Sequence, residues 1–151
     1  MSVTMRMKQI WLSMLVLGCV PAALATPESQ TFDDYTIHLN AFNSDTLQPS
    51  MAKAYNIIRS KNRGLLTVSV VKKSATVDAM PVAAHVKAKA TNLTGQLKHI
   101  KIREIRDGDA VYYISVFPVA DKETLDFTIH VTTKDNKGPY VVKMRQQFFT
   151  Q

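Results

Sequence analysis

The chain has 151 residues, which is the size of one domain with its own hydrophobic core and leaves little room for a second. Its 19 basic and 12 acidic side chains give a net charge of +7, which favours anionic partners or simply solubility. The single cysteine, Cys19, excludes an intramolecular disulfide framework.

Residues 1–25 have the pattern of a secretory signal peptide. Arg6 and Lys8 precede the uncharged apolar run 10–20, and Ala23 and Ala25 are the small residues that a signal peptidase reads. The run is shorter than the roughly 20 apolar residues of a membrane span. We therefore expect cleavage after Ala25, a periplasmic address, and a mature chain of residues 26–151 that has no transmembrane span.

Two other readings of this segment stay open. One is an uncleaved N-terminal anchor. The other is a lipoprotein attached through Cys19, although Leu17 is bulky where that signal prefers a small residue. With cleavage after Ala25, the loss of Arg6 and Lys8 lowers the net charge from +7 to +5 and removes the only cysteine. A mature chain of this kind has no thiol nucleophile or thiolate metal site, and nucleic acid is not an expected partner outside the cytoplasm.

Most of the mature chain shows the two-residue alternation of half-buried strands. Residues 26–34 are polar and indicate a flexible lead-in. About seven strands follow at a spacing of roughly ten residues, over 35–41, 66–70, 84–90, 97–106, 111–119, 125–131 and 140–149. Ile105 is out of phase with Ile100 and Ile102, which predicts a bulge near Arg103 or Glu104. The run 111–119 is apolar on both faces, as in a central strand.

One segment interrupts this pattern. Pro49 suits the first position of a helix, and Met51, Tyr55 and Ile58 share one helical face. A helix of about two turns must be held by packing, so this face is expected to lie on the sheet. A basic turn, 59–64, leads into the next strand. The pattern predicts a mainly β fold, an antiparallel β-sandwich with one short helix.

No catalytic or metal-binding constellation is evident. His38, His85, His99 and His130 stand singly on polar strand positions, without metal-ligand spacing. No serine lies in a glycine-flanked turn that would raise a nucleophile, and the few carboxylates are mostly next to turns. We predict no catalytic residue, no metal and no cofactor.

Basic residues are the remaining signal. His85, Lys87 and Lys89 form one outward stripe, and His99, Lys101 and Arg103 form a second on the next predicted strand. If those strands pair, the stripes make one positive face that Lys143 and Arg145 extend. A solvated face, or edge lysines that prevent strand aggregation, explains the same pattern without a partner.

The stretches NAFNSDTLQPSMAKAYNIIRSKNRGLLTVSV and VYYISVFPVADKETLDFTIHV and the ending VKMRQQFF resemble the proteobacterial domain of unknown function 4426. The resemblance covers essentially the whole mature chain. It implies an exported protein with an immunoglobulin-like β-sandwich, and it carries no activity or site residue. One departure is Gln48 before Pro49, where the family more often has a serine or threonine cap.

The leading hypothesis is a non-catalytic periplasmic module that binds or assists an envelope protein or an anionic envelope surface. The alternative is a small enzyme or carbohydrate-binding protein that acts on envelope glycans. The segment between the predicted strands 35–41 and 66–70 supplies two candidate groups: Phe42 and Asn43 as the lining of a groove under the helix, and the cations of the basic turn 59–64. The candidate binding residues are Phe42, Asn43, Arg59, Lys61, Arg63, Lys87, Lys89, Lys101 and Arg103.

Overall fold

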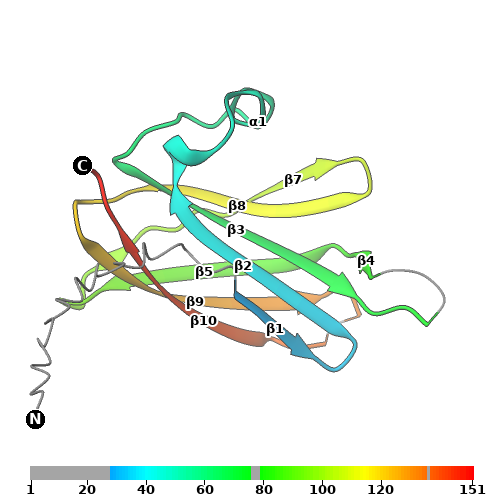
Figure 1. Cartoon of the computed structure of the whole chain (residues 1–151). Coiled ribbons are helices and arrows are strands. Elements are labelled where there is room, and N and C mark those ends of the chain that lie inside the picture. Colours follow the sequence, from blue (N-terminus) through cyan, green and yellow to red (C-terminus); the bar gives the residue numbers. More distant parts are fainter. Residues whose placement is uncertain (1–27, 76–78, 136) are drawn as a thin grey trace, which may run out of the picture.

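Two antiparallel sheets make up the computed structural model, which describes residues 28–75, 79–135 and 137–151 (Figure 1). The first sheet has the order β1 (Glu28–Phe32), β2 (Tyr35–Asn43), β3 (Arg63–Lys72), β8 (Ala110–Pro118) and β7 (Arg103–Asp107), with β4 (Met80–Pro81) beside the end of β3. The second has the order β10 (Tyr140–Phe148), β9 (Glu123–Thr133), β5 (Ala84–Asn92) and β6 (Leu97–Lys98). The predicted class, a mainly β immunoglobulin-like sandwich with one short helix, is confirmed.

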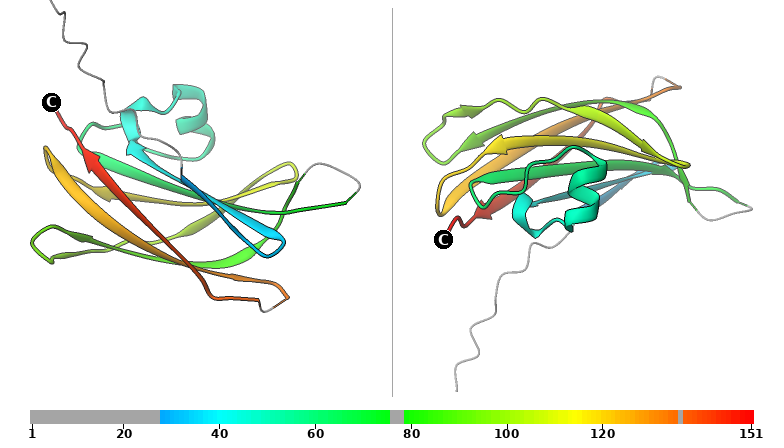
Figure 2. Two further views of the ribbon diagram at one scale, coloured as in Figure 1. Left: turned by 60° about the horizontal axis from the view of Figure 1, so that its bottom comes forward. Right: turned by 90° about the horizontal axis from the view of Figure 1, so that it is seen from above.

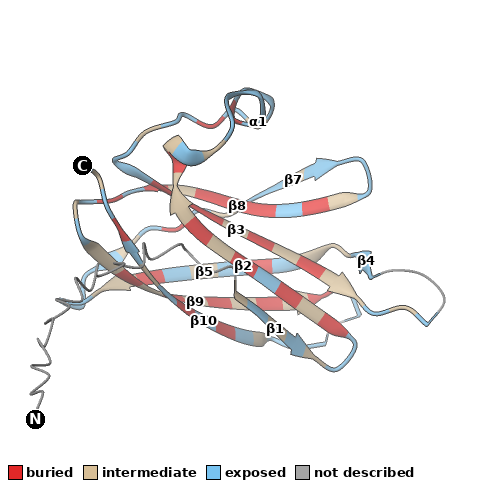
Figure 3. Cartoon of the chain, viewed as in Figure 1, coloured by how far each residue is buried: buried red, intermediate tan, exposed pale blue. Residues whose placement is uncertain are grey.

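The core lies between the sheets, where every second residue is buried along most of β2 and β9 (Figure 3). On β2 the buried set includes Ile37 and Leu39, and on β9 it includes Phe127 and Ile129. Each large apolar side chain that leaves water in this way contributes about 1.5–3 kcal/mol. On these strands, the residues that the two-residue alternation predicts to be buried do face the core.

At one end of the core, Phe117 packs against Phe127 and Phe148, with ring centroids 5.6 and 5.8 Å apart. Gly64 of β3 lies beneath these rings. A Cβ atom at this position would come within 2.5 Å of the Phe117 ring, so the close packing requires glycine.

The crossover from β2 to β3 carries a short 3-10 helix (Ser44–Thr46) and α1 (Pro49–Ala54). Figure 2 shows that this segment covers the outer face of the first sheet, on the side away from the second sheet. Gln48 is the N-cap residue of α1 and makes no capping bond with its side chain. Packing therefore holds the helix in place, as its length requires.

Three expectations about local structure are wrong. The predicted lead-in contains β1, which pairs with β2 from Glu28 to Phe32. The predicted strand 97–106 is two strands, because β6 belongs to the second sheet, β7 belongs to the first, and residues 99–102 cross between them. Alternation alone cannot reveal such a crossing, since it reports which face is buried and not which sheet a strand joins.

The third concerns the helix. α1 ends at Ala54, and Asn56 has a φ of +52°, so the repeat from Met51 to Ile58 runs past its end. Ile58, which was predicted to pack on the sheet, is 64% exposed, and its neighbour Ile57 is buried instead.

The signal peptide, its cleavage after Ala25 and the lipoprotein alternative at Cys19 lie outside the described residues. Within the described part of the chain, none of the helices has the length and apolarity that crossing a bilayer demands.

Candidate functional site

An apolar groove lies between α1 and the outer face of the first sheet, with a cavity volume of about 210 Å³. Its lining includes Phe42, Met51, Ile57, Leu65 and Ile114. Outward positions of a sheet are polar when they face water, so apolar residues here reflect the cover that the helix supplies. The cover is incomplete, and the groove remains beside a second small core that contains Ala52.

The crossover that forms the groove is fixed by a buried serine. Ser44 Oγ lies 3.0 Å from the carbonyl oxygen of Ile58 and 3.1 Å from that of Ser60, and it accepts a hydrogen bond from the Ser60 amide at 3.0 Å. At the helix end, the Ile57 amide donates to the carbonyl oxygen of Ala52 at 2.8 Å. These bonds hold Ile57 against the sheet as part of the groove floor.

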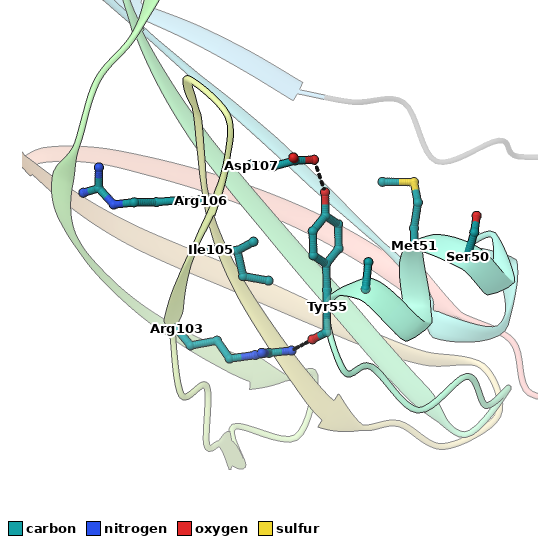
Figure 4. A pocket seen from close by; sticks show the side chains of 8 residues that line it. Ser50, Met51, Tyr55, Arg103, Ile105, Arg106 and Asp107 are labelled. Atoms are coloured by element: carbon teal, nitrogen blue, oxygen red, sulfur yellow. Dashed lines mark hydrogen bonds between the residues drawn. The ribbon is translucent and has the colours of Figure 1, made fainter.

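A more polar pocket of about 590 Å³ adjoins the groove and shares Met51, Tyr55 and Ile105 with it (Figure 4). Tyr55 Oη donates a hydrogen bond to Asp107 Oδ2 at 2.8 Å, and the Arg103 guanidinium donates to the backbone carbonyl of Tyr55. Both bonds join the end of α1 to β7. The hydrogen bond to Asp107 raises the pKa of Tyr55, so its hydroxyl stays protonated and acts as a donor.

A cationic hollow adjoins the groove, and both share Ile57 and Ile114 as lining residues. Its volume is about 420 Å³, and Arg63, Lys101 and Arg103 contribute to its wall. The three cations come from the start of β3, the crossing between the sheets and the start of β7. An apolar groove beside a cationic hollow suits a ligand with an apolar group next to an acidic one.

The candidate residues of the crossover from β2 to β3 have different roles. Phe42 lines the groove, as the sequence suggests, but Asn43 does not. The Asn43 amide instead donates to the carbonyl oxygens of Lys61 and Phe149, at 2.7 and 3.0 Å. Arg59 donates to the Asp45 carbonyl at 2.5 Å, which ties the basic turn to the 3-10 helix. Asn43 and Arg59 therefore support the crossover.

The predicted joint basic face is not formed as expected. Lys87 and Lys89 lie on the outer face of the second sheet, whereas Arg103 lies on β7 of the first. Lys101 is exposed in the segment 99–102, which crosses from one sheet to the other. The two stripes are separated because residues 99–102 leave the second sheet. Arg63 joins Lys101 and Arg103 in their place, a grouping that the sequence pattern does not predict.

Other groove residues were missed at the sequence level, chiefly Leu47, Leu65 and Ile114. The available signal was the run of apolar residues on both faces of 111–119 and the adjacent pair Leu65 and Leu66. Such runs indicate strands covered on both sides, but they do not show what covers them.

None of the residues that line the groove is a histidine, cysteine, aspartate or glutamate. Among the described residues there is no cluster of three or more histidine, cysteine, aspartate or glutamate side chains that suits a metal ion. His38 is exposed on β2, opposite Ser29 and Ser69 of the neighbouring strands. It lines neither the groove nor the cationic hollow.

Comparisons with known proteins agree with this architecture. The family model described as Domain of unknown function (DUF4426) matches residues 29–151. The crystal structure of a DUF4426 family protein from Pseudomonas aeruginosa PAO1 is similar, with a TM-score of 0.69 and 33% sequence identity over 83% of this chain and 96% of the other.

A more distant likeness is to FetP from uropathogenic E. coli strain F11, a protein recombinantly expressed in the periplasm of E. coli BL21(DE3). The TM-score is 0.56 with 11% identity, over 86% of this chain and 99% of FetP. At this identity the likeness concerns the fold alone. No curated protein matches the sequence.

Proposed function

This chain belongs to the family of domain of unknown function 4426, and from that premise we propose that it is a non-catalytic periplasmic protein that binds an envelope protein through the apolar groove under α1. The observation that supports the proposal is the groove itself. It is an apolar surface on the outside of a sheet, left open by a helix that only partly covers it, with a cationic hollow beside it.

The size of the groove favours part of a protein over a whole small molecule. Sites that enclose a drug-sized ligand are typically about 300–1,000 Å³. The groove, at about 210 Å³, holds one or two apolar side chains of a larger partner. Such an anchor in a pocket commonly contributes most of the binding energy of a protein interface. The adjoining Arg63, Lys101 and Arg103 favour an acidic residue close to that anchor.

The chemistry of the adjoining polar pocket supports binding better than catalysis. A general acid or base works best with a pKa near the working pH. The hydrogen bond to Asp107 moves the pKa of Tyr55 the other way, upward from its ordinary value. The Tyr55 hydroxyl and the Arg103 guanidinium are also already engaged, in bonds that fasten α1 to β7.

The periplasmic address is supported by the N-terminal pattern of Arg6 and Lys8, an apolar run and Ala23-Leu24-Ala25. The fold is also shared with FetP, which was obtained by expression in the periplasm.

Site-specific photocrosslinking in living cells tests the proposal. A photoreactive residue at Met51, which lines the groove and is 42% exposed, should capture a defined envelope protein. The same residue at Met80, exposed on β4 beside the opposite end of β3 from the groove, is the matched control. With the captured protein purified, Met51→Glu should weaken binding tenfold or more, which is about 1.4 kcal/mol.

Two results would count against this function. One is equal capture from both positions. The other is no protein capture from Met51, together with tight retention of the purified protein on isolated cell-wall glycan. The second result would favour the carbohydrate-binding alternative.

A further inference from the structure

The outer face of the second sheet is strongly basic. Cross-strand pairing places Lys89 opposite Thr128 and Thr128 opposite Lys143, with Lys87 opposite His130 in the next row. Neighbouring strands lie about 4.8 Å apart, so the three ammonium groups share one small area. None of the salt bridges among the described residues involves these lysines.

Glu28, at the start of β1, lines the same surface hollow as Lys143. The acid at an outward position of the strands themselves is Asp126, on β9 between Thr91 and Arg145. Arg145 donates to both carboxylate oxygens, at 2.6 and 2.9 Å. This bond lowers the pKa of Asp126, so the pair is an ion pair with no net charge. The charge of Lys87, Lys89 and Lys143 is therefore not balanced by acids on the same strands.

Two leucines project beside this basic face. Leu93 and Leu97, in the turn after β5 and in β6, are 68% and 71% exposed, more than the other large apolar residues in the described chain. Leu97 is opposite Thr91, an outward position of β5, so it lies on the same side of the sheet as Lys89. Figure 2 shows this hairpin projecting from one end of the sandwich.

The hairpin is an ordered turn. The side-chain oxygen of Asn92 accepts bonds from the Thr94 amide at 3.1 Å, the Thr94 hydroxyl at 2.7 Å and the Gln96 amide at 2.9 Å. Gly95 supplies the positive φ, +84°, that the turn needs. The exposure of the leucines is therefore built into the fold.

We propose that this surface, Lys87, Lys89 and Lys143 with Leu93 and Leu97, docks on an anionic phospholipid bilayer. Cations attract the headgroups, and apolar side chains enter the boundary between headgroups and acyl chains. The leucines favour a bilayer over a soluble polyanion or a glycan, because neither of those offers hydrocarbon in which to bury them. The surface is on the opposite side of the sandwich from the groove, so the inference relies on the proposed function only for an address beside a membrane.

Vesicle sedimentation with the whole exported protein, from which the signal peptide has been removed, tests the inference. The protein should bind vesicles that contain phosphatidylglycerol and should not bind pure phosphatidylcholine. Binding should fall as salt rises from about 0.1 M to about 1 M, since the Debye length falls from about 10 Å to about 3 Å. With the signal peptide removed, Leu97→Trp supplies the sole tryptophan, and its emission should shift to shorter wavelength on binding.

The double variant Lys87→Gln/Lys89→Gln should lower vesicle affinity by about tenfold or more. Leu93→Ser/Leu97→Ser should lower it by a similar factor. Lys53→Gln/Lys73→Gln and Met80→Ser, which alter exposed residues away from this surface, should leave it unchanged. All the altered side chains are exposed or half-buried, and circular dichroism verifies that each variant is folded.

The inference is overturned if phosphatidylglycerol vesicles are not bound, or if the leucine variant binds as the unaltered protein does. Equal binding to dextran sulfate and to the vesicles would identify a general polyanion surface and also overturn it. None of these results bears on the groove, because the vesicle assay contains no protein partner.

Discussion

The side chain of Asn43 joins three segments that are far apart in the sequence: the end of β2, the basic turn and the C-terminal residues. Its amide nitrogen carries two hydrogens and donates one to the carbonyl oxygen of Lys61 and one to that of Phe149. The Phe149 link has a sequence separation of 106 residues. A single amide therefore joins the crossover to the residue that follows the last strand, which is a structural role, while Asn43 does not line the groove.

Asn43→Asp is expected to destabilise the protein by about 1–3 kcal/mol, because a carboxylate keeps the shape but has no hydrogen to donate to either carbonyl. Urea unfolding should show a lower midpoint with an unchanged slope. Asn62→Asp is the matched control, since Asn62 is an exposed residue of the same turn and bonds to Ser60 and Val119 through its backbone atoms. Equal effects at both positions would contradict the assigned role.

At the scale of elements, the loop between β9 and β10 is tied to the start of β2. Asp135 accepts hydrogen bonds from the Thr133 hydroxyl and from Tyr35 Oη, the latter at 2.8 Å. These two bonds, and then Lys137, lower the pKa of Asp135 from 3.8 to about 2. The ionised carboxylate is thus favoured in the folded state relative to the unfolded chain.

A depressed folded-state pKa means that the stabilisation is complete above pH about 4 and is lost as pH falls toward about 2. Asp135→Asn should therefore lower the thermal midpoint at neutral pH and reduce its fall between pH about 4 and about 2. Melting curves across this range measure both effects. Asp109→Asn, in the β7–β8 turn, is the control. A variant with the full acid dependence of the unaltered protein would show that other carboxylates cause it.

The elements differ in how well the sequence predicts them. Strands with one buried face, such as β2 and β9, follow the alternation closely because burial is a local property of each residue. The crossing at residues 99–102 was missed because membership of a sheet depends on distant partners. β1 was missed for the same reason, since its polar residues are held by pairing with β2.

The candidate site was predictable only in part. Phe42 was expected in a groove under the helix and lines it, whereas Asn43 was expected there and does not. The cationic hollow was not predictable, because Arg63 and Lys101 are brought together by the sheet order and not by any shared strand.

At the scale of the whole molecule, the two outer faces of the sandwich have different characters. The first sheet carries α1, the apolar groove and the cationic hollow, whereas the outer face of the second is basic and carries no helix among the described residues. A molecule that lies on a bilayer through the second sheet turns its groove away from the lipid. The two proposed surfaces are therefore compatible, and a partner can enter the groove of a membrane-docked molecule.

The N-terminus decides whether a covalent anchor adds to this docking. Cleavage after Ala25 leaves Thr26 and Pro27 before the first residue of β1, Glu28, whereas lipidation at Cys19 would leave a longer tether. Ala23 and Ala25 fit the signal peptidase pattern, and Leu17 fits the lipoprotein pattern poorly. We therefore expect the intact mass of the exported protein to correspond to a free Thr26.

The variant Cys19→Ser tests the same expectation without relying on the mass measurement alone. It should change neither the processed N-terminus nor the amount of protein recovered with the envelope, because the docking surface of the second sheet remains. A lipidated Cys19, or loss of envelope association in the serine variant, would contradict the expected cleavage. In the same cells Leu93→Ser/Leu97→Ser should release the protein from the membrane while leaving its N-terminus at Thr26. A protein anchored by a lipid on Cys19 would instead stay on the membrane in this variant.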